Sequence, residues 1–197
     1  MKKKNNKHWF LYLITFIQIL IVSCNRTERQ GIHSKKLNSN YNSNFTVEQL
    51  KEKLLGNPIS KINYLNGCFS VRDTLIYEDD RVFWRGKSVY LNKRFILLAE
   101  TNWKDTIHIS RLTIVGDFFK TASGIRIGSS LKSMKNFIIR NAAPNPDGFL
   151  SFKDKHDPSI SYYMDVSKYP DLANGKINNA NEMPSEIIVS SITVNKR

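Results

Sequence analysis

Residues 160–166 read ISYYMDV, in which every second residue from Ile160 to Val166 is apolar or aromatic. An alternation of period two is typical of a β-strand that buries one of its faces. Residues 69–77 (FSVRDTLIY) alternate in a similar way, and the continuous apolar run at residues 95–99 (FILLA) is typical of a central strand. These three stretches predict a domain that is built mainly on a β-sheet.

Further strands are predicted around these three. Residues 81–85 follow the turn-like pair Asp79-Asp80, and residues 186–194 are predicted to form the last strand. The apolar positions of residues 107–114 change parity half-way along. We expect a β-bulge near Ser110-Arg111, because one extra residue would bring both halves back to the same face.

The first helix is predicted from signals at both of its ends. Thr46 and Gln49 have the spacing of a capping box, in which each side chain binds the backbone N–H of the other residue. Gly56 can adopt the left-handed conformation that ends a helix, and Pro58 prevents the helix from continuing. We therefore expect a short amphipathic helix before the first strand.

A second helix is predicted over residues 130–139, where Ser129 can cap the first turn and a buried stripe begins at Leu131. Two helices among many short strands indicate an α+β fold. The strands follow one another too closely for repeated parallel crossovers. We therefore expect a mainly antiparallel sheet with about two helices packed on one face.

The two predicted helices also echo each other in sequence. Leu50-Lys51 is followed by Asn57-Pro58, and Leu131-Lys132 is followed by Pro144. A duplicated unit of one helix and one sheet would produce this echo, and so would chance.

The N-terminus has the pattern of an export signal. Residues 1–23 carry four lysines and no acidic residue, and the apolar run from Trp9 to Val22 spans about 14 residues, whereas a helix needs about 20 to cross a bilayer. The run ends in Ile21-Val22-Ser23-Cys24, which resembles the lipobox of bacterial lipoproteins. The resemblance implies cleavage between Ser23 and Cys24, diacylglycerol on the Cys24 thiol, and a fatty acid such as palmitate on the new amino terminus. The alternative is a buried cysteine in an ordinary membrane anchor.

A lipidated Cys24 predicts the layout of the mature chain. Residues 24–44 are polar and rich in Asn and Ser, so we expect a flexible tether that spans on the order of 25 Å. Residues 45–197 are long enough to form a single α+β envelope domain with an adequate core. Lipidation leaves Cys68 as the only free cysteine, which excludes an intramolecular disulfide; we expect Cys68 to be a small buried residue.

The charge is strongly basic, with 30 Lys+Arg against 17 Asp+Glu. Removal of the four lysines of residues 1–23 leaves 26 basic residues and a net charge of +9. Nucleic acid is the usual partner of such a chain, but export argues against it. We expect lipid head groups, anionic glycans or an acidic envelope protein as partners, or a basic surface that is simply solvated.

Residues 121–134 (TASGIRIGSSLKSM) combine two glycines, a short apolar stretch and a capped helix. They resemble a turn of small envelope lipoproteins, including outer-membrane assembly lipoproteins of the SmpA/OmlA type, although Ala143-Pro144 stands where that family continues with Gly-x-Pro. The resemblance implies helices packed on one face of an antiparallel sheet, and a binding or scaffolding role. Phosphate binding at the helix start is an alternative, but no phosphate-binding glycine motif is present.

The candidate catalytic and metal-binding residues are also residue types that are common in turns. Glu78-Asp79-Asp80 could supply paired carboxylates for glycoside hydrolysis, but a hairpin turn needs the same residue types. The segment at residues 153–158 matches no calcium-loop or zinc-helix pattern, although three of its side chains could ligate a metal ion, namely Asp154, His156 and Asp157. His108 and Asp105 lack a nucleophile motif to complete a triad. We therefore predict no catalytic residue, no metal and no cofactor.

These observations predict a non-enzymatic lipoprotein of the cell envelope, anchored through Cys24 in the outer membrane or facing the periplasm, that binds a partner or assists assembly. Two alternatives remain, an inhibitor or immunity-type protein and a glycan-active hydrolase. A deep pocket with convergent carboxylates would favour the hydrolase. A sheet face with aromatic side chains such as Trp84 and Trp103 would favour a binding protein.

Overall fold

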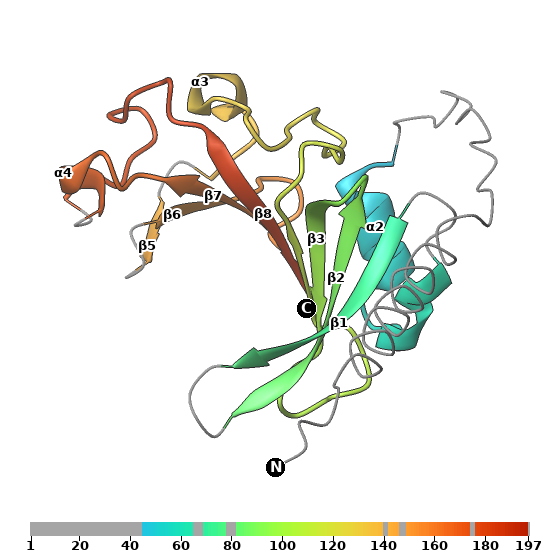
Figure 1. Ribbon diagram of the computed structural model, residues 1–197. Coiled ribbons are helices and arrows are strands. Elements are labelled where there is room, and N and C mark those ends of the chain that lie inside the picture. Colours follow the sequence, from blue (N-terminus) through green and yellow to red (C-terminus); the bar gives the residue numbers. More distant parts are fainter. Residues whose placement is uncertain are drawn as a thin grey trace, which may run out of the picture. The chain divides into compact units, whose positions relative to one another are not determined.

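The computed structural model describes residues 45–64, 69–77, 82–139, 142–145, 149–173 and 176–196, which all belong to one compact unit that spans Asn42–Arg197 (Figure 1). The described strands form one eight-stranded sheet in which every neighbouring pair is antiparallel. The prediction of a mainly antiparallel sheet is therefore confirmed. The strands are β1 (Phe69–Tyr77), β2 (Phe83–Leu91), β3 (Arg94–Glu100), β4 (Arg111–Ile114), β5 (Ala143–Asn145), β6 (Phe149–Lys153), β7 (Ile160–Asp165) and β8 (Val189–Asn195).

The sheet consists of two four-stranded arms, with the strand order β1-β2-β3-β4-β8-β7-β6-β5. Each arm is a run of strands in chain order, and the last strands of the two arms, β4 and β8, pair with each other. Figure 1 shows the arms meeting at an angle at this pair. A helical segment precedes each arm, which is the topology that a duplicated unit would give. The described helices are α2 (Val47–Leu54), the 3-10 helix η1 (Ile59–Tyr64), α3 (Leu131–Met134) and α4 (Pro170–Ala173).

One face of the sheet is apolar from β1 to β6. The strand register aligns seven residues in a single row, and side chains that are directly opposite on paired strands share a face. Six of the seven are buried in the core, and Val71 packs against it. The row runs Val71, Val89, Leu97, Ile114, Ile192, Tyr162, Phe152.

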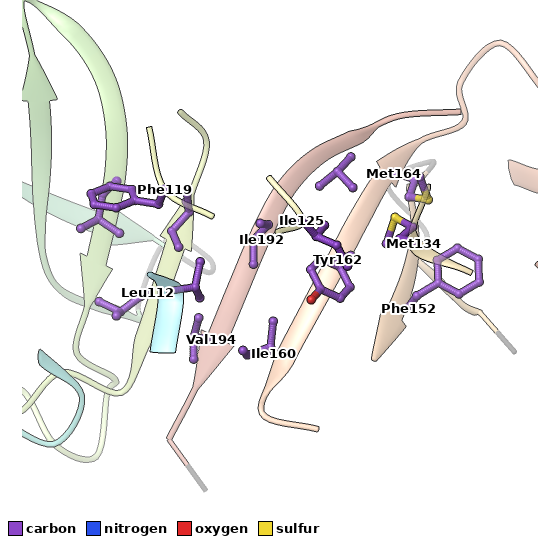
Figure 2. Close-up of a cluster of buried hydrophobic side chains, with 14 of the residues drawn as sticks. Leu112, Phe119, Ile125, Met134, Phe152, Ile160, Tyr162, Met164, Ile192 and Val194 are labelled. Carbon is purple, nitrogen blue, oxygen red and sulfur yellow. The ribbon is translucent and has the colours of Figure 1, made fainter. Parts of the chain in front are cut away.

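Residues outside the strands complete this core. Figure 2 shows Ile125 and Met134, from the segment between the two arms, among the strand residues Tyr162 and Ile192. Val47, Leu50 and Leu54 of α2 belong to the same buried cluster. The core is therefore built jointly by the apolar face and by the segments that precede each arm.

The first helix forms as its end signals predict. The Thr46 hydroxyl accepts a hydrogen bond from the Gln49 N–H, and the Gln49 side chain accepts one from the Thr46 N–H. Gly56 follows the helix with a φ of 74°, in the left-handed region that favours glycine. All of these signals are local in sequence, which is why the pattern predicts this helix well.

The second helix is much shorter than predicted, because α3 contains only Leu131–Met134. Ser129 does not cap it; the Ser129 hydroxyl accepts the Arg126 N–H instead, and the N-cap residue is Ser130. After Met134 the chain leaves the helix so that Ile139 can donate its N–H to the Lys153 carbonyl, beside β6. A backbone pairing between distant segments thus outweighs the local helix pattern.

The predicted strand over residues 107–114 is wrong in its first half. Only β4, from Arg111, joins the sheet; the Ile109 N–H binds the Asn57 carbonyl, and His108 forms an isolated bridge with Pro58. The bulge expected near Ser110-Arg111 is therefore absent. The change of parity reflects a segment that pairs with the chain just after α2.

Candidate binding face

The second face of the sheet is polar where the first is apolar. The register aligns another row of seven side chains across the same strands, and only Leu98 among them is apolar. The row runs Arg72, Ser88, Leu98, Thr113, Thr193, Ser161, Lys153. We call the sheet surface that carries this row the polar face.

An ion pair lies on the polar face where the two arms meet. Glu100 is only 1% exposed, and it accepts hydrogen bonds from Nε and Nη2 of Arg111 at 2.8 and 2.7 Å. Thr113 donates a third, at 3.3 Å. The hydrogen bonds to Glu100 raise the pKa of Arg111 above its ordinary value although burial lowers it, with a smaller contribution from Tyr163. Arg111 is therefore a fixed and permanently charged group.

A hollow of about 390 Å³ opens beside this ion pair. Its walls come from β2, from the loop between β3 and β4, and from the ends of β4 and β8. They include two indole rings, two side-chain amides and one guanidinium, namely Trp84, Trp103, Asn102, Asn195 and Arg111. Lys196 also borders the hollow, but its Nζ lies beside Gly56, just after α2, 3.7 Å from where a Cβ of that residue would be. Among the described residues, those that line the hollow include no Asp or Glu.

The loop that carries Trp103 is held by two side-chain turns. Asn102 Oδ1 accepts the backbone N–H groups of Lys104 and Asp105 at 2.9 and 2.8 Å. Asp105 Oδ1 accepts those of Ile107 and His108 at 3.1 and 3.0 Å. Such turns fix the backbone locally. Trp103, which is 60% exposed, therefore projects from an ordered loop rather than from a loose one.

Asp105 and His108, which could have formed part of a catalytic triad, are both engaged in the hydrogen bonds of this loop. The backbone N–H groups of His108 and Ile107 lower the pKa of Asp105 to about 2, against the effect of burial. The ring atom Nδ1 of His108 lies 2.9 Å from Asp105 Oδ2. The Asp105 carboxylate thus organises the turn.

Within the described ranges, two buried side-chain polar atoms have no hydrogen-bond partner, Trp84 Nε1 and Thr193 Oγ1. Both residues belong to the polar face, because Trp84 has the same parity as Ser88 on β2. A buried polar group without a partner costs about 1–3 kcal/mol. Groups of this kind are uncommon in folded proteins and call for an explanation.

The acidic side chains in residues 153–158 form hydrogen bonds that stabilise the connection between β6 and β7. Asp154 is buried; its Oδ1 accepts the N–H groups of His156 and Asp157, and its Oδ2 accepts the Tyr162 hydroxyl at 2.6 Å. Asp157 binds Lys51 and Ser159. No group of three His, Cys, Asp or Glu side chains in the described part of the chain has the geometry of a metal site.

The glycine-containing segment at residues 121–134 folds into turns. Gly124 and Gly128 adopt φ values of 82° and 85°, and the apolar stretch between them forms an isolated bridge but no strand. A second hollow of about 520 Å³ lies nearby, lined in part by Arg94, Lys120 and Arg126. Arg94 forms an ion pair with Asp117. All three basic residues of this hollow have exposed side chains.

Several predicted residues lie outside the described ranges. These are the cleavage and lipidation residues Ser23 and Cys24, the free Cys68, and the acidic triplet Glu78-Asp79-Asp80. Within the described ranges, no helix is both long and apolar enough to cross a bilayer.

The polar face contains residues that the sequence analysis missed. The sequence points to Trp84 and Trp103 as candidate surface contacts, and the structure brings both to the same hollow. Glu100, Arg111 and Asn195 were missed, because their side-by-side position depends on the strand register and not on a local motif. A charged residue at the end of an apolar strand, as at Glu100, is the one signal that could have pointed to them.

The fold is similar to that of a solved structure. It is the uncharacterized protein yfeY from Escherichia coli, which is 14% identical in sequence, with a TM-score of 0.51 over 71% of this chain and 90% of that chain. At this identity the likeness extends to the fold alone. No protein-family model matches the chain, and no curated protein matches it in sequence.

Proposed function

We propose that this protein is a non-enzymatic, lipid-anchored protein of the cell envelope that binds a partner through the polar face. The single observation that carries the proposal is the division of the sheet into two unlike faces. One row of seven residues is apolar and forms the core, and the opposite row is polar and is flanked by the hollow that Trp84 and Trp103 line.

The proposal includes the position of the helical segments. Buried residues of α2 and α3 belong to the same cluster as the apolar row, which supports helices that cover this one face. The polar face would then be the surface that remains for a partner. A polar surface with a few aromatic side chains is typical of proteins that bind partners reversibly.

The location rests on Cys24. Two or more acyl chains hold a protein stably on a bilayer, where a single chain is marginal. With a flexible tether over residues 24–44, the domain would remain at the membrane, in the outer membrane or facing the periplasm, where nucleic acid is not a partner. Its basic charge favours an acidic envelope protein, an anionic glycan or lipid head groups.

A photocrosslinking experiment in living cells tests this proposal. A photoreactive phenylalanine analogue would replace Tyr163 on the polar face or Trp103 in the hollow that flanks it. The matched controls are the exposed residues Glu52 of α2 and Lys132 of α3. We expect adducts, with a protein or with a glycan, from Tyr163 and Trp103 alone. Equal adducts from the control positions, or none from the polar face, would contradict the proposal. If the crosslinked partner is a lytic enzyme that the protein inhibits, the inhibitor alternative holds instead of an assembly role.

A further inference from the structure

We propose that the hollow beside Trp84 and Trp103 binds an acidic carbohydrate, a glycan whose sugar rings carry carboxylates, as uronic acids do. Trp103 supplies the surface on which a sugar ring stacks, and Arg111 binds the carboxylate. This inference rests on the proposed function and names the chemistry of the partner.

The size and lining of the hollow fit a small polar ligand with apolar faces. Its volume of about 390 Å³ falls within the range of about 300–1,000 Å³ that is usual for ligand pockets. A sugar ring has C–H faces that pack on an aromatic plane and hydroxyl groups that need hydrogen bonds. The indole rings of Trp84 and Trp103 supply aromatic planes, and the amides of Asn102 and Asn195 can supply hydrogen bonds.

The charges select an anion. Arg111 lines the hollow, and Lys104 Nζ lies 4.9 Å from the centre of the Trp103 ring, which lines it as well. The Glu100 carboxylate, which lies beside the hollow, is neutralised by two hydrogen bonds from Arg111 and is almost fully buried. The described residues that line the hollow include no Asp or Glu, so a ligand with its own carboxylate is favoured over a neutral one.

The geometry of Arg111 points to a carboxylate in particular. Its Nε and Nη2 bind Glu100, which fixes the plane of the guanidinium. Guanidinium has five N–H donors, so the edge formed by Nη1 and Nη2 keeps donors for a second partner. Among the described residues, Nη1 has no hydrogen-bond partner, and the side chain is 44% exposed. A planar edge with two parallel donors binds a carboxylate in a bidentate manner.

A titration of the purified full-length chain in detergent tests the inference. The ligands would be an oligogalacturonate, the same oligosaccharide with its carboxyl groups reduced to alcohols, and a polyphosphate of similar charge, each followed by tryptophan fluorescence and calorimetry. We expect saturable binding of the oligogalacturonate, with at least tenfold weaker binding of the reduced form. Equal binding of the reduced form, tighter binding of polyphosphate, or no binding of the oligogalacturonate would overturn the proposal.

Matched variants separate the hollow from the rest of the basic surface. Trp103→Ala should weaken oligogalacturonate binding at least tenfold, whereas Ile107→Ala, which removes an equally exposed side chain from the same loop, should leave it unchanged. Arg111→Lys keeps the charge but loses the bidentate edge, and it should reduce the preference for the acidic over the reduced ligand. Thermal unfolding of each variant would confirm that it is folded. Equal affinities of Trp103→Ala and Ile107→Ala would overturn the proposal.

The titration and the photocrosslinking experiment test the two proposals separately. Crosslinks from the polar face in cells, together with no uronate binding by the purified chain, would refute this inference alone. Absence of crosslinks from the polar face would refute the proposed function, whatever the titration shows.

Discussion

Lys51 of α2 binds Asp157, a residue 106 positions further along the chain, with Nζ 2.5 Å from Oδ2. Asp157 lies in the connection between β6 and β7, so this ion pair joins the helix that precedes the first arm to a loop of the second arm. Ser159 binds the same carboxylate through its N–H and its hydroxyl, at 3.1 and 2.7 Å. The two arms are thus tied together by a polar contact as well as by the shared core.

This contact predicts a loss of stability in acid. Burial raises the pKa of Asp157, but the hydrogen bonds from Lys51 and Ser159 outweigh it and lower the pKa to about 2, from an ordinary value near 3.8. A depressed pKa contributes stability that is present above about pH 4 and is lost as the pH falls towards 2. Asp157→Asn should therefore cost about 1 kcal/mol at pH 7, after allowance for solvent screening, and almost nothing near pH 2.

Urea unfolding of both proteins at pH 7 and near pH 2 measures this difference. Asp171→Asn is the matched control, because Asp171 pairs with Lys176 on an exposed surface and should change stability by less than about 0.5 kcal/mol. A penalty for Asp157→Asn that is the same at both pH values would contradict the assignment.

The ion pair on the polar face predicts a larger effect. Arg111→Ala would leave the carboxylate of Glu100 buried without its cation, which costs about 3–5 kcal/mol. Arg94→Ala breaks a pair whose two side chains are both exposed, so it should cost less than about 1 kcal/mol. Chemical denaturation compares the two variants, and similar penalties would show that Glu100 is more solvated than the structure indicates.

Gly116, which follows β4, lies close to Ile96 of β3. A methyl group at this position would lie 2.6 Å from Ile96 Cγ2 and 3.0 Å from Ile96 Cα, a backbone atom that cannot easily move. Gly116→Ala should therefore cost about 1–3 kcal/mol. At Gly124 a methyl group would meet nothing within 4 Å, and only its φ of 82° opposes alanine, at about 1 kcal/mol. Thermal unfolding should rank Gly116→Ala as the less stable variant; the reverse order would contradict the close packing.

The lipobox predicts a specific processing defect. Cys24→Ser removes the thiol that would carry diacylglycerol, so the protein should accumulate with residues 1–23 attached and take up no labelled palmitate. Cys68→Ser is the control and should be processed and labelled normally. Mass spectrometry and fatty-acid labelling of the protein from its own cells measure both properties. Normal cleavage and labelling of Cys24→Ser would refute lipidation.

The sequence predicts those elements whose signals are local. The capping box at Thr46 and Gln49 and the alternation from Ile160 to Asp165 each lie within one element, and both elements form where expected. The second helix is shorter than predicted because its end depends on the bridge between Ile138 and Asp154, which are far apart in sequence.

The binding face depends on long-range pairing as well. Glu100 and Arg111 become neighbours only when β3 and β4 pair in the observed register, and Asn195 joins them only when β8 pairs with β4. The sequence contains no motif that fixes these registers. It could therefore suggest the tryptophans as surface contacts, but not the ion pair or the hollow beside them.

A partner that occupies the polar face in the cell would shield Trp103 from solvent, and hydroxyl-radical footprinting of intact cells measures this shielding. We expect Trp103 to be oxidised several times more slowly in cells than in the purified full-length chain. The exposed side chains of Tyr77 and Phe83, on the β1–β2 hairpin, should be oxidised at the same rate in both samples. Equal oxidation of Trp103 in cells and in the purified chain would show that no partner covers this side chain in the cell.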